Sequence, residues 1–203
     1  MEHTQNQIIL RGTLFSKPEF SHENHDKTFF RFSLEIPRLS GVSDILPVIA
    51  EQTLLECAEL AEGTMIRVSG QIRSHNLRLD GKRHLLIFVF ASALVCEDGE
   101  PLNECVLAGP ICREPHYRRT PLGREICDIM LAVPRSFRRA DYLPCILWGR
   151  TAQEASLCHT RDILQLSGRL QSRSYTKLTE NGPEERIAYE ISVMQAHFER
   201  LSI

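Results

Sequence analysis

Arginine is the residue type whose distribution first suggests chemistry in this sequence. After residue 100, Lys177 is the only lysine among 14 basic residues. A guanidinium pairs with a phosphate and also stacks on a flat ring. Up to residue 100 the chain has 10 basic and 14 acidic residues (−4) and beyond it 14 and 12 (+2), which sum to the net charge of −2. That sum argues against binding nucleic acid through bulk positive charge, and it leaves the second half as the candidate for an anionic partner.

Cysteine and histidine predict neither a metal site nor a catalytic centre. The seven cysteines are scattered, without a C-x-x-C pair or a histidine at zinc-ligand spacing, so most of them are expected in the core, in a reducing compartment. The eight histidines do not pair with carboxylates or cysteines at catalytic spacing, and no G-x-x-x-x-G-K-[ST], H-E-x-x-H or G-x-S-x-G motif occurs. We therefore expect no enzyme, no cofactor and no metal.

The chain repeats itself once. Identical residues recur at an interval of 97, and of 98 after one inserted residue, which indicates an internal duplication. The pairs include Asn6 and Asn103, Gly12 and Gly109, Arg38 and Arg135, Asp44 and Asp141, Gly70 and Gly168, and Ser74 and Ser172. With about 100 residues per copy, each half has the usual size of one domain. The segment 97–101 is the natural boundary, so the predicted domains are 1–98 and 103–203.

Each copy predicts the same order of elements. Alternating apolar residues predict strands over 8–14, 28–36, 45–50, 65–79 and 85–95 in the first copy, and over 105–111, 125–133, 142–148, 163–175 and 186–198 in the second. Residues 52–62 and 150–159 are rich in Ala, Leu, Glu and Gln and predict one short helix in each. Residues 117–119 are expected in a solvated turn. Three strands, a helix and two strands follow the order of the OB-fold, so the predicted architecture is all-β with short helices, as two tandem five-stranded barrels.

The second copy resembles a known family. The stretches 141–154 (DYLPCILWGRTAQE), 166–175 (LSGRLQSRSY) and 188–193 (AYEISV) are similar to the bacterial single-stranded DNA-binding proteins. The resemblance covers nearly all of residues 103–195 and is faint over residues 6–96. It implies sequence-independent binding of single-stranded DNA in replication, recombination or repair.

The resemblance also implies a set of stacking residues. In that family, aromatic side chains on the barrel surface stack on successive bases, and the matching positions here are Phe137, Tyr142, Trp148 and Tyr175. The corresponding positions of the first copy hold Ser40, Ile45, Glu51 and Leu77, none of them aromatic. We therefore expect residues 103–203 to bind DNA and residues 1–98 to serve assembly.

Arginines are interleaved with these four aromatics, as a groove that tracks phosphates requires. The candidate phosphate-binding residues are Arg135, Arg138, Arg139, Arg150, Arg169 and Arg173.

The resemblance suggests an assembly as well. Family members assemble four barrels as a homotetramer, so a chain with two barrels is expected to form a homodimer. They also end in a flexible tail with acidic residues, whereas this sequence ends at FERLSI, which puts recruitment of proteins through such a tail in doubt.

The remaining expectations concern location and alternatives. Ile8–Leu10 is too short an apolar run for a signal peptide or membrane span, which predicts a cytoplasmic protein without membrane contact. The resemblance implies that it is associated with the bacterial nucleoid. Two alternatives stay open: a primosome-type replication restart protein that mainly bridges other proteins, and an adaptor whose first barrel is an interaction module.

Overall fold

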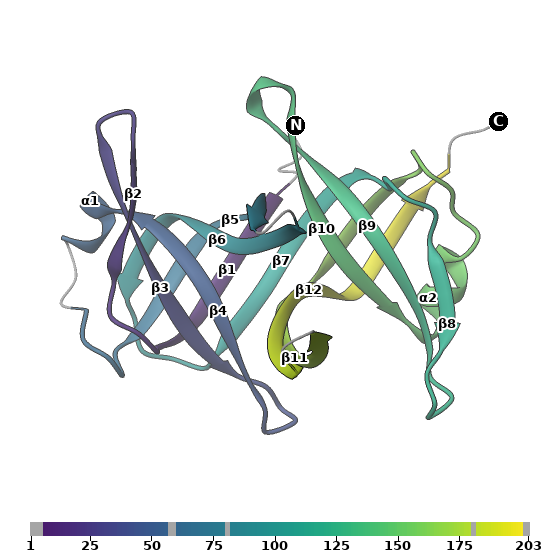
Figure 1. Ribbon diagram of the computed structural model, residues 1–203, viewed down its shortest axis with the longest axis horizontal. Helices are drawn as coiled ribbons and strands as arrows, with labels where there is room; N and C mark the ends of the chain where they lie inside the picture. Colours follow the sequence, from purple (N-terminus) through teal and green to yellow (C-terminus); the bar gives the residue numbers. More distant parts are fainter. Residues whose placement is uncertain (1–5, 57–59, 80–81, 180–181, 201–203) are drawn as a thin grey trace.

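Strands make up most of the molecule, arranged as two similar units (Figure 1). The structure, a computed structural model, describes residues 6–56, 60–79, 82–179 and 182–200. The first unit consists of β1 (Asn6–Leu14), β2 (Glu19–Asn24), β3 (Lys27–Pro37), β4 (Ser43–Glu51), α1 (Gln52–Leu55), β5 (Met65–Leu79) and β6 (Lys82–Cys96). The second consists of β7 (Leu102–Pro110), β8 (His116–Arg119), β9 (Glu125–Arg135), the 3-10 turn η1 (Ser136–Arg138), β10 (Arg139–Trp148), α2 (Gly149–Ala155), β11 (Ile163–Thr179) and β12 (Gly182–Glu199).

Each unit closes into a five-stranded barrel. In the first, β1 pairs with β3 and β5, β3 with β4, and β5 with β6, all antiparallel, while β4 and β6 run parallel and close the barrel. In the second, β11 and β12 follow the same scheme, with a parallel β10–β12 pair and a bridge from Ile111 to Leu131. This connectivity is that of the OB-fold, so the predicted fold class is confirmed.

Glycines allow the close approaches that barrel closure requires. A Cβ on Gly109 would lie 2.2 Å from the carbonyl oxygen of Ala132, and one on Gly12 would lie 2.5 Å from that of Glu35. Strands β7 and β1 therefore bend against the neighbouring barrel wall only because these positions lack a side chain.

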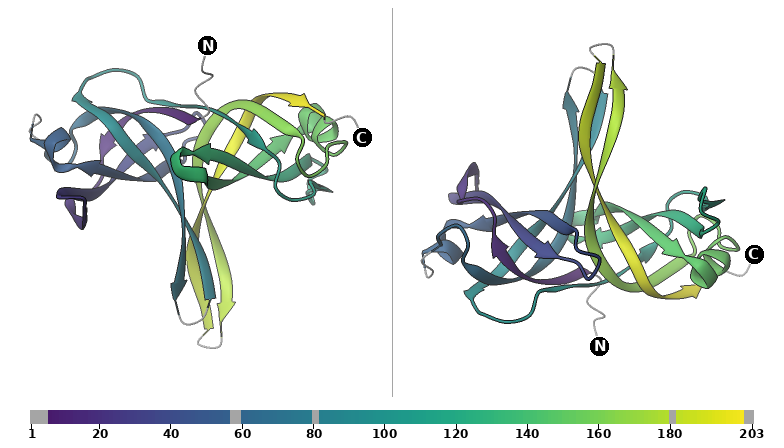
Figure 2. Two further views of the ribbon diagram at one scale, coloured as in Figure 1. Left: turned by 90° about the horizontal axis from the view of Figure 1, so that it is seen from above. Right: turned by 90° about the horizontal axis from the view of Figure 1, so that it is seen from below.

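Strands β1 and β7 join the two barrels. They pair antiparallel from Asn6 with Leu107 to Arg11 with Leu102, giving one sheet in the order β2-β3-β4-β6-β5-β1-β7-β11-β12-β10-β9-β8. The hairpins β5–β6 and β11–β12 project from the same side of the body (Figure 2). We call these two hairpins the arms, and the contact between the barrels at their base the seam.

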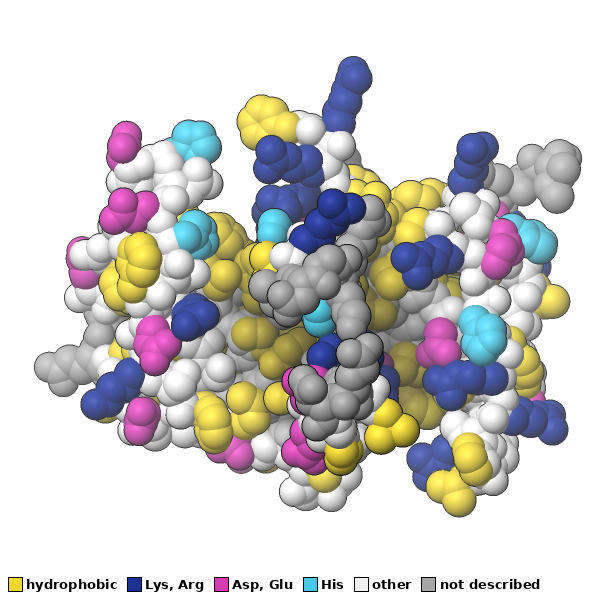
Figure 3. All heavy atoms as spheres, viewed as in Figure 1, with side chains coloured by type: hydrophobic (Ala, Val, Ile, Leu, Met, Phe, Trp, Pro, Cys, Tyr) yellow, Lys and Arg dark blue, Asp and Glu magenta, His cyan; other side chains and the backbone are white. Residues whose placement is uncertain are grey.

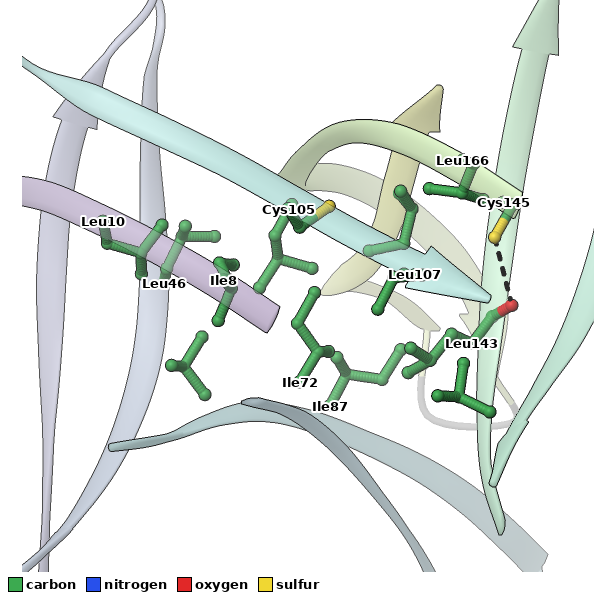
Figure 4. Close-up of a cluster of buried hydrophobic side chains, with 14 of the residues drawn as sticks. Ile8, Leu10, Leu46, Ile72, Ile87, Cys105, Leu107, Leu143, Cys145 and Leu166 are labelled. Carbon is green, nitrogen blue, oxygen red and sulfur yellow. Dashed lines mark hydrogen bonds between the residues drawn. The ribbon is translucent and has the colours of Figure 1, made fainter. Parts of the chain in front are cut away.

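The apolar core runs through both barrels. Ile8, Leu10 and Ile72 of the first barrel belong to one buried cluster with Leu107 and Leu143 of the second (Figure 4). Because side chains alternate along a strand, one face of each strand supplies this core and the other stays available for the surface.

Some elements differ from the sequence-based expectation. The helix expected over 52–62 covers only Gln52–Leu55, and residues 57–59 lie outside the described part. Residues 117–119, expected in a turn, belong to strand β8, which like β2 adds an edge strand to its barrel. Every residue of β8 is exposed, so the period-two signal of a half-buried strand is missing there. Among the described residues no helix is long and apolar enough to span a membrane.

Candidate nucleic-acid interface

Two reciprocal contacts hold the seam, and the residues repeated in the sequence make both of them. On one side, buried Asp44 of the first barrel accepts the backbone N–H of Ser172 at 2.6 Å and pairs with Arg38. Arg38 also donates to the carbonyl oxygen of Ser172 at 2.7 Å. A carboxylate without solvent contact is stable only when it is paired and hydrogen-bonded, so these bonds fix β11 on the first barrel.

On the other side, Asp141 of the second barrel takes the place of Asp44. Its side chain has no exposed surface and accepts the backbone N–H of Ser74 at 2.7 Å. Arg135 and Arg73 each approach this carboxylate at 3.3 Å, Arg135 from the same barrel and Arg73 from the first. The Ser74 hydroxyl accepts the backbone N–H of Tyr142 at 2.7 Å. A residue of the first barrel therefore holds the strand that carries a candidate stacking residue of the second.

The two sides of the seam differ in charge. Asp44 has Arg38 as its partner, and the hydrogen bond that Arg38 donates to Asp44 raises the pKa of Arg38 above its usual value. Asp141 has two guanidinium partners, and the pKa of Arg73 is lowered, first by burial and then by repulsion from Arg135. The Asp141 side thus carries more positive charge than its carboxylate compensates.

The repeated asparagines stabilise the bases of the arms in the same way in both barrels. Asn6 accepts the N–H of Ile72 at 2.9 Å and donates to its carbonyl oxygen at 2.7 Å. Asn103 makes the same two bonds to Leu170, at 3.0 and 2.6 Å. The residues shared by the two copies therefore maintain the scaffold and the seam.

The second barrel has a groove of about 660 Å³ that we call the C-groove. Trp148 lines it, 39% exposed, with its indole N–H donating to Ser192 at 3.3 Å. The charged residues that line it are Arg113, Arg118, Arg173, Glu114, Asp128 and Glu190. Arg118 pairs with Asp128 at 2.8 Å and Arg173 lies 3.6 Å from Glu190, so much of its positive charge is neutralised internally.

A second groove, of about 820 Å³, lies between the first barrel, the arms and the β9–β10 hairpin, and we call it the seam groove. Its arginines are Arg31, Arg73, Arg135 and Arg139, and its rings are those of His22, Phe29, His75, Phe88, Phe90 and Tyr189. No Asp or Glu occurs among the described residues that line it. Figure 3 shows the arms between two hollows with hydrophobic walls and Lys or Arg side chains gathered above, over the β9–β10 hairpin.

The structure distributes the predicted site residues over several places. Trp148 and Arg173 line the C-groove, whereas Arg135 and Arg139 line the seam groove. Phe137 is 93% exposed, in a left-handed conformation (φ 61°) beside Arg138 in the β9–β10 loop. Tyr142 on β10 and Tyr175 on the second arm are 43% and 39% exposed.

The other predicted arginines have different surroundings. Arg173 stacks over the Tyr175 ring at 5.8 Å, which makes a pair of the kind that a base can join. Arg150 on α2 is highly exposed and pairs with Glu154, and Arg169 faces Ser192 across β11 and β12. Neither lines one of the two grooves.

Sequence reasoning missed the rings of the seam groove. Phe88 and Phe90 alternate along β6 with Ile87, Val89 and Ala91, which are buried in the barrel. Both faces of this strand are therefore apolar, so the sequence predicts a strand over 85–95 but does not indicate that one of its faces lines a groove. Phe29 stacks on His22 at 4.8 Å and lies 5.7 Å from Phe90, so these three rings form one wall.

Among the described residues, no group of three or more His, Cys, Asp or Glu is arranged to hold a metal ion.

Comparison with solved structures identifies the same fold over the whole chain. The wild-type single-stranded DNA binding protein from Thermus aquaticus superimposes with a TM-score of 0.76, covering 98% of this chain and 93% of that one at 24% identity. A deletion mutant of the same protein gives 0.78, with 98% and 96% covered at 23% identity.

Comparison with protein families gives a more specific result. A family model described as the single-strand binding protein family matches residues 102–199. Single-stranded DNA-binding protein B of Bacillus subtilis is 38% identical over 80 residues, which are 36% of this chain and 71% of that protein. Single-stranded DNA-binding protein A of the same organism is 36% identical over 81 residues, and the match spans about half of its length, 47%. The chain belongs to the single-strand binding protein family.

Proposed function

We propose that this chain binds single-stranded DNA without sequence preference and without catalysis, protecting it during replication, recombination or repair. The observation that carries the proposal is the half-exposed Trp148 in the arginine-lined C-groove of an OB-fold that belongs to this family. Every base has a π-face, so an indole in such a groove stacks on any sequence, and each stacked base contributes about 1 to 3 kcal/mol.

The other predicted residues extend this surface. Tyr175 with Arg173 provides a second stacking position, and Phe137, Arg138 and Tyr142 are exposed on the β9–β10 hairpin. Arginines serve here as partners of successive phosphates, because a guanidinium retains its charge at any physiological pH. We favour this function over protein bridging, because the groove places the indole of Trp148 among arginines.

Trp148 is the chain's only tryptophan, and it tests the proposal directly. Titration of the full chain with oligothymidylate should quench its fluorescence, because a stacked base contacts the indole. The logarithm of the binding constant should fall with the logarithm of salt concentration by about 0.7 for each phosphate neutralised. A chain that shows neither quenching nor binding at low salt would refute the proposal.

We also propose that the working form is a homodimer with four OB-folds. Val95, Val106 and Met194 lie on β6, β7 and β12 and are 49%, 52% and 72% exposed. They belong to the part of the sheet centred on β1 and β7, which a second copy could cover. The mass in solution, by light scattering, should then be twice the 23.2 kDa of the chain. The monomer mass at micromolar concentration would contradict it.

The proposed place of action is the bacterial cytoplasm, at the nucleoid, where single-stranded chromosomal DNA is exposed.

A further inference from the structure

The seam groove differs from the C-groove at equivalent positions. On β5 and β6, Arg73 lies opposite Phe88, whereas the matching pair on β11 and β12 is Gln171 opposite Glu190. The Gln171 amide donates a hydrogen bond to Glu190 at 2.8 Å, so these two side chains are hydrogen-bonded to each other. The pair also adds a carboxylate to the C-groove. The pair in the first barrel instead adds a cation and an aromatic ring.

Two arginines of the seam groove pair with one buried carboxylate, and a third arginine lies beside them. Arg73 and Arg135 both pair with Asp141, and Arg139 lies directly opposite Arg135 across β9 and β10. Opposed residues on antiparallel strands have their Cβ atoms about 5 Å apart, and like charges at that distance repel. Within the described part of the chain Arg139 has no ion-pair partner. The cluster therefore carries an excess of positive charge that an anion would neutralise.

Rings lie in the same groove as this cluster. Phe88, Phe90 and Tyr189 line it and are only partly buried, and burial raises the pKa of Tyr189, so its hydroxyl stays neutral. Phe88 and Phe90 come from the first barrel, whereas Tyr189 comes from the second. A polyanion whose repeating units are flat rings matches this combination of cations and π-faces.

We propose that the seam groove is a binding site for single-stranded DNA, built by both barrels, in which a phosphate sits among Arg73, Arg135 and Arg139. Bases of the same segment stack on Phe88, Phe90 and Tyr189. The site rests on the proposed function and adds a second segment to it. The first barrel thus contributes directly to binding, in addition to the assembly role expected from its sequence.

Charge decides in favour of DNA over a protein segment as the occupant. Four arginines line the seam groove without a carboxylate among its described lining residues, whereas the C-groove has three of each charge. The seam groove is also the larger, at about 820 Å³ against about 660 Å³. Because the cluster needs residues of both barrels, separated halves would lack it.

The test uses the full chain with Arg73→Gln, which installs the residue that the second barrel has at this position. Asp141 keeps Arg135 and Ser74, so the seam contact remains. The probe is a labelled oligothymidylate of about 30 nucleotides, enough for two OB-folds, followed by fluorescence anisotropy. Loss of one phosphate contact should weaken binding about eightfold at about 50 mM salt and reduce the salt slope by about 0.7. Trp148 quenching at saturation should be unchanged.

A second variant and a control separate contact from folding. Phe88→Leu should weaken binding about tenfold with an unchanged salt slope, because it removes a stacking ring and no charge. Arg124→Gln removes one positive charge from the exposed β8–β9 turn, which lines neither groove, and should bind like the wild type.

The outcomes distinguish the two proposals. Wild-type affinity and salt slope in both R73Q and F88L, with Trp148 still quenched, would overturn the seam site and leave the proposed function intact. A wild-type chain that binds no oligothymidylate would overturn both. Melting temperatures show whether a weakened variant is folded. A matching loss in R124Q would also overturn the seam site, because net charge would then explain the effect.

Discussion

Replacing Asp141 by Asn should destabilise the protein and at the same time strengthen its binding to single-stranded DNA. The buried carboxylate accepts the Ser74 N–H and compensates part of the charge of Arg73 and Arg135. Asparagine has nearly the same shape and can still accept the Ser74 N–H, but it has no charge. Two guanidinium groups would then face each other without a carboxylate.

The magnitude follows from the contacts that are lost. Removing one partner of a fully buried ion pair costs about 3 to 5 kcal/mol. The side chains of Arg73 and Arg135 are 20% and 31% exposed, so water compensates part of this, and we expect a loss of about 2 to 3 kcal/mol in the free energy of unfolding. For a chain of this length that corresponds to a fall of about 6 to 9 °C in melting temperature.

The effect on DNA binding has the opposite sign. A phosphate bonded to Arg73 would lie roughly 6 Å from the Asp141 carboxylate, where repulsion costs about 1 kcal/mol in a partly solvated site. Removing that charge should therefore tighten binding about fivefold at low salt. The matched control is Asp44→Asn, which removes the equivalent carboxylate on the other side of the seam, where Arg38 is its ion-pair partner and the seam groove's arginines are not involved.

Urea denaturation followed by circular dichroism and anisotropy titration with oligothymidylate measure the two effects. D44N should be less stable than the wild type and bind DNA with the same affinity, whereas D141N should be less stable and bind DNA more tightly. A D141N protein as stable as the wild type would refute the ion-pair reasoning. Equal affinities of D141N and D44N would refute the view that the carboxylate competes with phosphate.

Two further predictions concern the scaffold. Gly109→Ala should lower the free energy of unfolding by about 3 kcal/mol, because its Cβ would lie 2.2 Å from a backbone oxygen. Gly41→Ala should lower it by about 1 kcal/mol, because Gly41 has open space around it but a φ of 82°. Equal melting temperatures of the two variants would contradict this. Burial raises the pKa of Cys105 to about 12 and that of Cys127 to about 11. As the pH rises, the unfolded chain therefore loses these thiol protons before the folded protein does. The free energy of unfolding should fall above about pH 9, by up to about 1.4 kcal/mol per pH unit for each thiol. The urea midpoint between pH 8 and about 11 measures this, and Cys105→Ala should reduce the slope; a midpoint independent of pH would contradict it.

The sequence was sufficient to predict the barrels, because their signals are local. Alternation along residues 28–36 and 125–133 indicates strands with one buried face, and the central glycines of β1 and β7 indicate bent strands. The 97-residue interval predicted the duplication. Strands β2 and β8 escaped prediction because both are edge strands with little or no buried face.

The seam could not be predicted in this way, because it depends on contacts between distant residues. Asp44 and Ser172 are 128 positions apart. Nothing in the neighbouring sequence distinguishes an aspartate that binds the other barrel from a solvated one. Arg135 was expected to pair with phosphate, and it also compensates Asp141. The signal that could have found the seam groove is the apolar outer face of β6, since a face that does not pack into the core must pack against something else.

Likeness between the two copies therefore identifies scaffold residues and says little about which barrel binds. The residues that are identical in the two copies make contacts that both barrels need, as do Asn6, Asp44 and Ser74 with their counterparts. The functional differences lie where the copies diverge, as in the replacement of the Gln171–Glu190 pair by Arg73 and Phe88. The positions of the first barrel that match the stacking residues of the second hold no aromatic residue. The rings that the first barrel contributes to the seam groove come from other positions, on β3 and β6. The first half of the chain has a net charge of −4, and yet it supplies part of the seam groove, which has arginines and no described acidic residue in its lining. The local arrangement of charges, rather than the net charge of a domain, therefore determines the electrostatic potential at a bound phosphate.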